Sequence, residues 1–193
     1  ELSIIKGDLP DNKLPICVGE SNFTRQKGHN TSELEDQEYV IQIDKSYIIL
    51  AGKDQLASSE KINLGNDIVF VKEKTSSLFE YGKAIGESSF EQITIPATYE
   101  QQGTCYAVYD FLETFFGVRW YGPHPNNVVI PQHTSVLLSP ENIKRSLAIK
   151  YRAGTGFGST MNKDLFFNAS PEMYQLYDRR MRVGGEKWGC NHS

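Results

Sequence analysis

Acidic side chains are the groups in this chain best suited to acid–base chemistry, but their spacing does not bring two of them together. The run Glu33–Glu38 holds four carboxylates and is typical of a solvated segment. Asp110 and Glu113 are expected on the polar face of a helix. General acid–base catalysis needs groups within reach of the same reacting bond. The sequence therefore assigns no catalytic residue.

Metal-ligating and nucleophilic residues are scattered as well. The four histidines and three cysteines lack the HxH, HxxxH and CxxC spacings of metal and redox sites. They are His29, His124, His133, His192, Cys17, Cys105 and Cys190. Cys17 and Cys105 have apolar neighbours, which predicts buried thiols. The Gly-rich stretch Gly154–Gly158 lies too far from the next predicted helix for a nucleotide loop. No metal or cofactor is expected.

Composition and charge limit the classes of partner that this chain is expected to bind. The chain has 193 residues, 39% of them hydrophobic, and 20 basic against 24 acidic residues give a net charge of −4. This composition is typical of a folded domain. No basic stripe could follow a phosphate backbone, so no nucleic acid is expected. No apolar run approaches the roughly 18 residues that span a bilayer, so no membrane partner is expected either. Glu1–Ser3 lacks the pattern of a signal peptide.

The first third of the chain predicts strands. Leu2–Lys6 and Pro15–Val18 are short apolar runs bounded by turn residues. Tyr39–Ile43 and Tyr47–Leu50 flank a short polar turn, which is the clearest hairpin signal in the sequence. Between these pairs, the polar stretch Gly19–Gln37 predicts a loop with one helical turn.

Residues 55–102 differ in character from both flanks. They are rich in Ser, Gly, Glu and Lys, and hold two strand-like pieces, Ile68–Val71 and Gln92–Ile95. A connection this long inside a compact domain is unusual. We interpret it as a surface insertion that forms a small hairpin of its own.

Thr104–Phe116 is the strongest helical segment. Its apolar residues share one face and its polar residues the other. The apolar face holds Ala107, Val108, Phe111, Leu112 and Phe115, and the polar face holds Asp110, Glu113 and Thr114. Thr104 is predicted to cap the helix, and Gly117 to adopt a left-handed conformation after it.

Short strands are predicted after this helix. They are Val118–Tyr121, Val128–Ile130 and Ser135–Leu138. Arg119 is expected to face outward or pair with an acid. Trp120 is expected near the sheet edge or at a domain junction.

The last quarter reads as one βα unit. Leu147–Tyr151 predicts a strand, and Ser170-Pro171-Glu172 has the cap, first-turn proline and acid of a helix start. Gly184-Gly185 would end that helix. Because eight such units are needed to close a barrel, residues 147–193 are expected to begin a barrel domain that is truncated at Ser193.

A family resemblance emerges from two runs, Gly103–Glu113 (GTCYAVYDFLE) and Gly117–Tyr121 (GVRWY). Together they resemble the N-terminal domain that precedes the barrel in α-glucuronidases and in related bacterial proteins known only by a domain of unknown function. The chain is also similar, more remotely, to the second domain of β-N-acetylhexosaminidases. Gly52–Asp54, Val129–Pro131 and Tyr151-Arg152 follow the same order. The insertion 55–102 departs from it.

The resemblance implies an α+β fold. Residues 1–146 would form an accessory domain with a mainly antiparallel sheet and packed helices, and residues 147–193 the first unit of a TIM-type barrel. It also implies a secreted or periplasmic glycoside hydrolase acting on polysaccharide or glycan. The catalytic carboxylates of these families lie on later barrel strands, so this chain alone is expected to be inactive. Its carbohydrate partner would bind the barrel, and the unfinished barrel segment would favour self-association.

Arg152 is the one candidate substrate-binding residue. Barrel enzymes place substrate groups at the C-terminal ends of their strands, and a guanidinium holds hydroxyls or carboxylates with a fixed fork of donors. In the hexosaminidases an arginine at the end of the first barrel strand contacts the sugar, and the resemblance extends that role to Arg152. The alternative is an arginine that pairs across the domain interface. For Trp120, sugar stacking is an alternative to packing. For the whole chain, the alternative is a stand-alone glycan-binding or scaffolding module.

Overall fold

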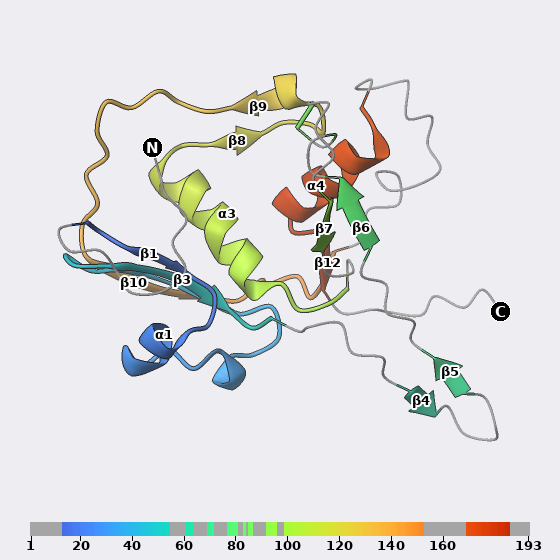
Figure 1. Cartoon of the computed structure of the whole chain (residues 1–193), viewed down its shortest axis with the longest axis horizontal. Helices are drawn as coiled ribbons and strands as arrows, with labels where there is room; N and C mark the ends of the chain where they lie inside the picture. The colour runs from blue at the N-terminus through green and yellow to red at the C-terminus, as the bar shows by residue number, and fades with distance from the viewer. Residues whose placement is uncertain are drawn as a thin grey trace.

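The computed structural model describes residues 13–54, 61–63, 69–71, 77–80, 83, 85–86, 92–95, 99–152 and 169–185. At its centre is a four-stranded sheet in the order β1-β3-β2-β10, and the long helix α3 lies across one face (Figure 1). Two of the three strand pairings are antiparallel and one is parallel. The predicted α+β class is therefore confirmed in its coarse form, with a mixed sheet. The predicted strand Leu2–Lys6 lies outside the described residues.

The hairpin at the middle of the sheet is confirmed. Strands β2 (Tyr39–Ile43) and β3 (Ile48–Gly52) pair antiparallel, with Ile41 opposite Leu50. Strand β1 (Ile16–Val18) runs parallel to β3 on the outer side. Every residue of β3 is buried. This explains why the run Ile48–Ala51 is continuously apolar instead of alternating.

The fourth strand, β10 (Glu141–Arg145), was not predicted. It pairs antiparallel with β2 over five residue pairs, from Glu141 opposite Ile43 to Arg145 opposite Tyr39. Its sequence, ENIKR, contains one apolar residue, and four of its five residues are exposed. An exposed edge strand needs no apolar alternation, so only the pairing with β2 reveals it.

The two faces of the sheet carry separate apolar clusters. The face toward α3 (Gly103–Phe115) buries Tyr39, Ile41, Ile43, Ile48, Leu50, Tyr106, Ala107 and Phe111. The opposite face buries Val40, Tyr47, Ile49 and Ala51. The second face is covered by Phe23 of α1 (Asn22–Gln26) and by Leu34, which follows the short helix η1 (Thr31–Glu33). The predicted loop Gly19–Gln37 thus holds two short helices.

The predicted faces of α3 are partly wrong. Ala107 and Phe111 are buried as expected, but Tyr106 is fully buried too, and Asp110 is 6% exposed although it was placed on the polar face. Asp110 tolerates burial because Tyr39 and Arg145 bind its carboxylate. Periodicity places a residue on a face, whereas the partners available there decide whether a charge can be buried.

The start of α3 is capped from a distance. Gln102 is the N-cap and makes no side-chain cap bond, so the predicted Thr104 cap is wrong. Instead, Asp54 Oδ1 accepts from the Thr104 N–H at 3.0 Å, and Thr104 Oγ1 accepts from the Gly52 N–H at 3.0 Å. A carboxylate at a helix N-terminus satisfies an otherwise unpaired donor. At the other end Gly117 has φ +67, as predicted.

The described residues of the inserted segment form two strand pairs. Strand β4 (Lys61–Asn63) pairs with β5 (Val69–Val71), and β6 (Ser77–Glu80) pairs with β7 (Gln92–Ile95). One hairpin was predicted, and both of its strand-like pieces are strands. An isolated β-bridge joins Asp54 to Gln102, so the segment leaves and re-enters the core at neighbouring points.

Directly after α3 the chain forms a small two-stranded ribbon. Strand β8 (Arg119–Trp120) pairs antiparallel with β9 (Val128–Val129), and the short helix η2 (Pro125–Asn127) lies between them. The predicted strand Ser135–Leu138 is wrong, since this stretch forms no strand. Leu137 is 99% exposed, while Leu138 packs against the core. Of the two leucines that suggested a strand, only Leu138 contacts the core.

The last described helix is α4 (Pro171–Arg180), capped by Ser170 as predicted. It ends at Arg180, so the prediction that Gly184-Gly185 ends it is wrong. Strand β11 (Tyr151–Arg152) precedes α4 and pairs antiparallel with β12 (Gly184–Gly185). The strand predicted over Leu147–Tyr151 is therefore wrong in extent, because of its residues only Tyr151 belongs to β11. Successive strands of a TIM-type barrel are parallel, whereas β11 and β12 pair antiparallel, so these two strands are not two successive strands of such a barrel. Among the described helices, none combines the length and apolar character needed to cross a membrane.

Candidate functional site

Arg152 lies where three segments of the chain meet. Its Nε donates to the Arg182 carbonyl at 2.6 Å, its Nη1 to the Ile149 carbonyl at 2.6 Å, and its Nη2 to Gln37 Oε1 at 3.2 Å. These acceptors belong to the turn after α4, the approach to β11 and the turn before β2. The guanidinium thus links the α4 segment to the sheet domain. We call the contacts that Arg152 and the arginines of the α4 segment make with the sheet domain and α3 the arginine junction. Its arginines are Arg152, Arg179, Arg180 and Arg182, and their partners are Gln37, Gln102, Tyr106, Glu113 and Trp120.

The ring of Tyr106 lies beneath this guanidinium. Arg152 Cζ is 5.8 Å from the ring centroid, within cation–π range. The Tyr106 side chain is 0% exposed, and its hydroxyl has no hydrogen-bond partner of normal geometry among the described residues. Burial raises the pKa of Tyr106, and the positive charge of Arg152 opposes that rise. Tyr106 therefore connects the junction directly to the apolar core below it.

Gln37 receives Arg152 on the side of the sheet domain. It is 1% exposed and has φ +66, a left-handed conformation that is uncommon for a residue other than glycine. Its backbone N–H donates to Gln101 Oε1 at 2.8 Å, and its Nε2 donates to the same oxygen at 3.2 Å. These bonds and the one from Arg152 offset a backbone cost of about 1–3 kcal/mol.

Three further arginines extend the junction along α4. Arg179 Nη1 donates to Gln102 Oε1 at 2.5 Å, and Arg182 Nη2 pairs with Glu113 Oε2 at 2.5 Å. Arg180 Cζ lies 5.7 Å from the centroid of the Trp120 ring. The α4 side therefore supplies the positive charges, and the α3 side supplies amide, carboxylate and aromatic acceptors. Burial lowers the pKa of Arg179.

One carboxyl group at the junction has a shifted pKa. Burial raises the pKa of Asp178 to about 6, against the opposing charge of Arg179. Shifted carboxyl groups are common at functional sites, but structural ion networks produce them as well. Glycoside hydrolysis generally uses two carboxyl groups on either side of the scissile bond. Asp178 alone does not supply that chemistry.

Two carboxylates expected in solvent are instead buried cross-links. Glu38, 8% exposed, accepts from the Glu35 N–H at 3.0 Å and pairs with Lys144 Nζ at 3.0 Å. Asp110 accepts from Tyr39 Oη at 3.0 Å and from Arg145 Nη1 at 2.9 Å. Burial, with Asp110 adding to it, raises the pKa of Tyr39 to about 12. Both carboxylates tie β10 to the rest of the domain.

The described part of the chain holds no group of three or more His, Cys, Asp or Glu residues that could bind a metal ion. Its histidines have separate partners. His29 Nε2 lies 2.6 Å from Gln42 Oε1, His124 Nδ1 accepts from the Asn126 N–H, and His133 Nε2 lies 3.1 Å from the Phe116 carbonyl oxygen. His192, Cys190 and the stretch Gly154–Gly158 lie outside the described residues.

The two described cysteines are half-buried free thiols. Burial raises the pKa of both, and that of Cys105 reaches about 11. A thiol with a raised pKa is a poor nucleophile at neutral pH. The prediction that both thiols are buried holds only in part, because each is half-buried.

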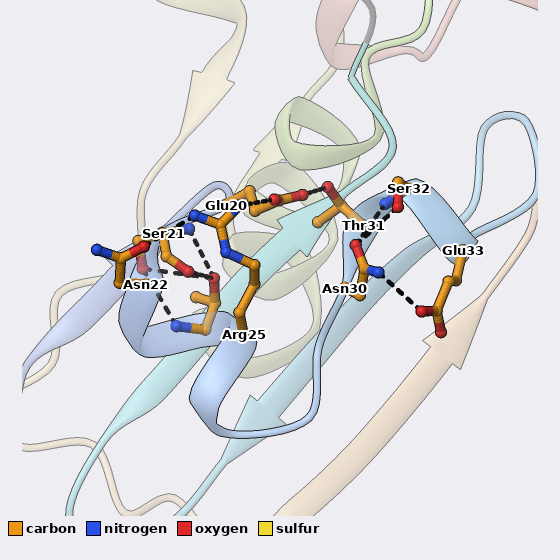
Figure 2. A network of polar contacts seen from close by, with 9 residues as sticks. Glu20, Ser21, Asn22, Arg25, Asn30, Thr31, Ser32 and Glu33 are labelled. Carbon is orange, nitrogen blue, oxygen red and sulfur yellow. Dashed lines mark hydrogen bonds and ion pairs between the residues drawn. The ribbon is translucent and has the colours of Figure 1, made fainter.

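A second polar network lies on the opposite side of the sheet, around α1 and η1 (Figure 2). Ser21 caps α1 and Asn30 caps η1 through bonds to backbone N–H groups. Arg25 pairs with Glu20 at 2.5 Å, and Glu20 also accepts from the Thr31 hydroxyl. These bonds satisfy the open ends of two short helices. We assign them a structural role.

Trp120 and Arg119 have their predicted positions. Trp120 is 8% exposed, and its ring meets Tyr109 edge to face at 5.2 Å. With Arg180 over it as well, the ring is occupied by protein contacts, which favours packing at the junction over sugar stacking. Arg119 faces outward, and its Nη1 donates to the Glu113 carbonyl at 2.7 Å.

Comparison of the chain with protein-family models, curated proteins and solved structures finds no match. The family resemblance therefore stays a prediction.

The amide partners in this junction were not found from the sequence. Gln37, Gln101 and Gln102 carry no charge and follow no period, so neither charge pattern nor amphipathicity singles them out. One signal was available. The α4 segment places Arg179, Arg180 and Arg182 within four residues, which is more positive charge than one helix end needs.

Proposed function

We propose that this chain is the non-catalytic N-terminal part of a secreted or periplasmic glycoside hydrolase, of the α-glucuronidase or hexosaminidase type. In this proposal the sheet and α3 form an accessory domain. That domain holds the first elements of a catalytic barrel, residues 147–193, in a fixed orientation. The substrate would be a polysaccharide or glycan bound by the barrel.

The arginine junction is the observation on which this proposal rests. Arg152, Arg179 and Arg182 reach Gln37, Gln102 and Glu113 on the other side. Directional bonds of this kind define an orientation more strictly than apolar contact does. An accessory domain that positions a strand end would need such a contact.

Arg152 is the proposed sugar contact. A guanidinium has five N–H donors, and three of these are used inside the protein. The remaining two, one on each Nη, make no hydrogen bond of normal length to another described residue and would bind a sugar hydroxyl or a uronic acid carboxylate. The three internal bonds would hold the fork in place, which reduces the entropy lost when the ligand binds.

Expression of the protein from its natural reading frame, followed by assays on aryl glucuronides and aryl N-acetylhexosaminides, tests the proposal. We expect activity in the longer protein and none in residues 1–193 alone. Arg152→Ala should lower turnover at least tenfold, Arg152→Lys should recover part of it, and the outward-facing Arg119→Ala should change nothing. Product released by residues 1–193, or full activity in Arg152→Ala, would contradict the proposal.

The alternative function is that of a stand-alone glycan-binding module, in which exposed aromatic rings would bind the sugar. Tyr121 is 68% exposed and Tyr151 is 39% exposed. Retardation of residues 1–193 in polysaccharide-containing gels, lost in Tyr121→Ala, would favour this function. A reading frame that ends at Ser193 would favour it too.

A further inference from the structure

Two glutamine side chains and the Arg152 guanidinium form a chain of hydrogen bonds. Gln101 Oε1 accepts from the Gln37 backbone N–H at 2.8 Å and from Gln37 Nε2 at 3.2 Å. Gln37 Oε1 in turn accepts from Arg152 Nη2 at 3.2 Å. Gln37 is 64 residues from Gln101 and 115 residues from Arg152. The chain of bonds therefore joins three segments that are distant in the sequence.

The donor and acceptor roles in this chain follow from its first member. A backbone N–H can only donate, so Gln101 must present its side-chain oxygen to Gln37 and not its amide nitrogen. The same oxygen requires a second donor, which is Nε2 of Gln37. The Gln37 amide consequently turns Oε1 toward Arg152, whose guanidinium can only donate. Each group thus determines the orientation of the next one.

The position of Gln37 makes this chain of bonds specific. Gln37 is 1% exposed, so bulk water does not replace a partner that is lost. A residue other than glycine keeps a left-handed conformation, here φ +66, only where its surroundings hold it there. Two bonds from Gln37 to one oxygen of Gln101 provide such a hold.

We propose that Gln37 and Gln101 are positioning residues that set the orientation of the Arg152 guanidinium. The Arg182 carbonyl, the Ile149 carbonyl and Gln37 Oε1 bind the Nε, Nη1 and Nη2 of Arg152. Of these three acceptors, Gln37 Oε1 is the one whose direction depends on another side chain. A planar fork bound at all three nitrogens has a fixed direction for its remaining donors. The inference rests on the proposed function only in taking a sugar as the ligand of those donors.

Two substitutions at position 101 test the acceptor separately from the bulk of the side chain. Gln101→Glu keeps an oxygen for both donors of Gln37, whereas Gln101→Met has a similar length and no strong acceptor. Gln101 is only half-buried, so both variants should fold. Gln37→Gly is a third variant. It removes the acceptor for Arg152 and suits the left-handed backbone at this position.

The measurement is the exchange with water of the Arg152 Nε–H, followed by nitrogen-15 NMR on residues 1–193 and assigned with Arg152→Lys. This group should exchange slowly in the unchanged protein and in Gln101→Glu. In Gln101→Met and in Gln37→Gly it should exchange roughly tenfold faster or more, as expected for loss of a hydrogen bond to a charged group. The backbone amides of β2 and β3 are the internal control and should keep their rates.

Three results would overturn the proposal. They are fast exchange of the Arg152 Nε–H in the unchanged protein, equal rates in Gln101→Met and Gln101→Glu, and faster exchange throughout β2 and β3 in Gln101→Met. The last of these would mean that Gln101 supports the fold in general and not the guanidinium. None of these measurements needs hydrolase activity. Release of the guanidinium in Gln101→Met, together with full activity of Arg152→Ala in the longer protein, would support the positioning role and contradict only the proposed sugar contact.

Discussion

The two sides of α3 are held by different kinds of contact. Toward the sheet, α3 packs on a cluster whose members are at most 4% exposed and mainly apolar. Toward α4, the contacts are mainly arginine bonds, and Leu176 is the one buried residue of that helix, at 8% exposure. Figure 1 shows α3 lying between these two surroundings.

The two kinds of contact have different consequences: the apolar contacts determine the stability of the fold, and the arginine contacts determine the orientation of the α4 segment. Burial of apolar area is non-directional and stabilises by about 25 cal/mol per Å², so the sheet side should fold cooperatively. A charged hydrogen bond contributes only a small part of its gross interaction energy to net stability, because both partners lose water. Its strength also falls steeply when the donor–acceptor geometry changes. We expect the sheet domain to determine the global melting temperature, and the junction to open locally before it.

The largest effect should come from a cavity under α3. Ile41, 0% exposed, sits in the sheet-side cluster, and Ile41→Ala should lower the free energy of unfolding by about 2–5 kcal/mol. Leu176→Ala on α4 is the matched variant and should change the global unfolding midpoint much less. Urea denaturation followed by circular dichroism measures both. Equal losses in the two variants would show that the regions unfold as one unit.

Gly103 should be nearly as sensitive, because β3 and α3 cross at this point. A Cβ atom here would lie 2.5 Å from the Lys53 nitrogen and 2.6 Å from the Glu38 carbonyl oxygen. Gly103→Ala should therefore cost about 1–3 kcal/mol through displaced backbone. Thermal melting is the measurement. An unchanged melting temperature would mean that the crossing is looser than the structure indicates.

Loss of the central arginine should loosen α4 and spare the sheet. Arg152→Ala removes three hydrogen bonds and leaves the buried Gln37 oxygen without its donor, a cost of about 1–3 kcal/mol. Amides of residues 171–183 should exchange faster, while those of β2 and β3 keep their rates. Arg119→Ala is the control. Faster exchange throughout the sheet would remove the distinction between the two regions.

The junction should also respond to pH through Asp178. Its folded pKa of about 6 lies above the ordinary 3.8, so folding favours the protonated form. The stabilisation is complete below about pH 3.8 and is lost as the pH rises through 6. Asp178→Asn should remove this dependence and stabilise α4 at pH 7 by on the order of 1 kcal/mol, after allowance for partial exposure.

Hydrogen exchange of α4 at several pH values measures the Asp178 effect. Exchange rates are first corrected for their intrinsic pH dependence. Protection that rises between pH 4 and 6 in the unchanged protein would contradict the predicted sign.

The smallest effect should follow excision of most of the insertion. Joining residue 56 to residue 98 by a short Gly-Ser linker keeps the Asp54–Gln102 bridge and the Gln101 and Gln102 contacts. Halving a loop changes its closure free energy by only about 0.6 kcal/mol. The shortened protein should melt cooperatively near the original temperature. Loss of a cooperative melt would show that the insertion belongs to the core.

Sequence reasoning worked where one local signal dominated. The hairpin Tyr39–Gly52, the helix Gly103–Phe115 and the Ser170 cap follow from β-rich runs, apolar periodicity and capping chemistry. It failed for β10, for the burial of Asp110 and Glu38, and for the extent of β11. Each of these depends on a partner far away in the chain, which a local pattern does not contain.

The candidate site shows the same division. The end of an apolar run and the family resemblance together indicate Arg152 as a candidate, but neither indicates its partners. Its partners Gln37 and Arg182 lie 115 and 30 residues away, and only the folded chain brings them within hydrogen-bonding distance.

By itself, the sequence determined which segments form the central hairpin and the main helix, because each has to bury an apolar face. Only the tertiary structure decided which charges are buried, that Thr104 is capped by Asp54, and that Arg152 joins α4 to the sheet domain. Those outcomes depend on donors and acceptors that meet in space, and free energies of desolvation and pairing are defined only once both partners are in place.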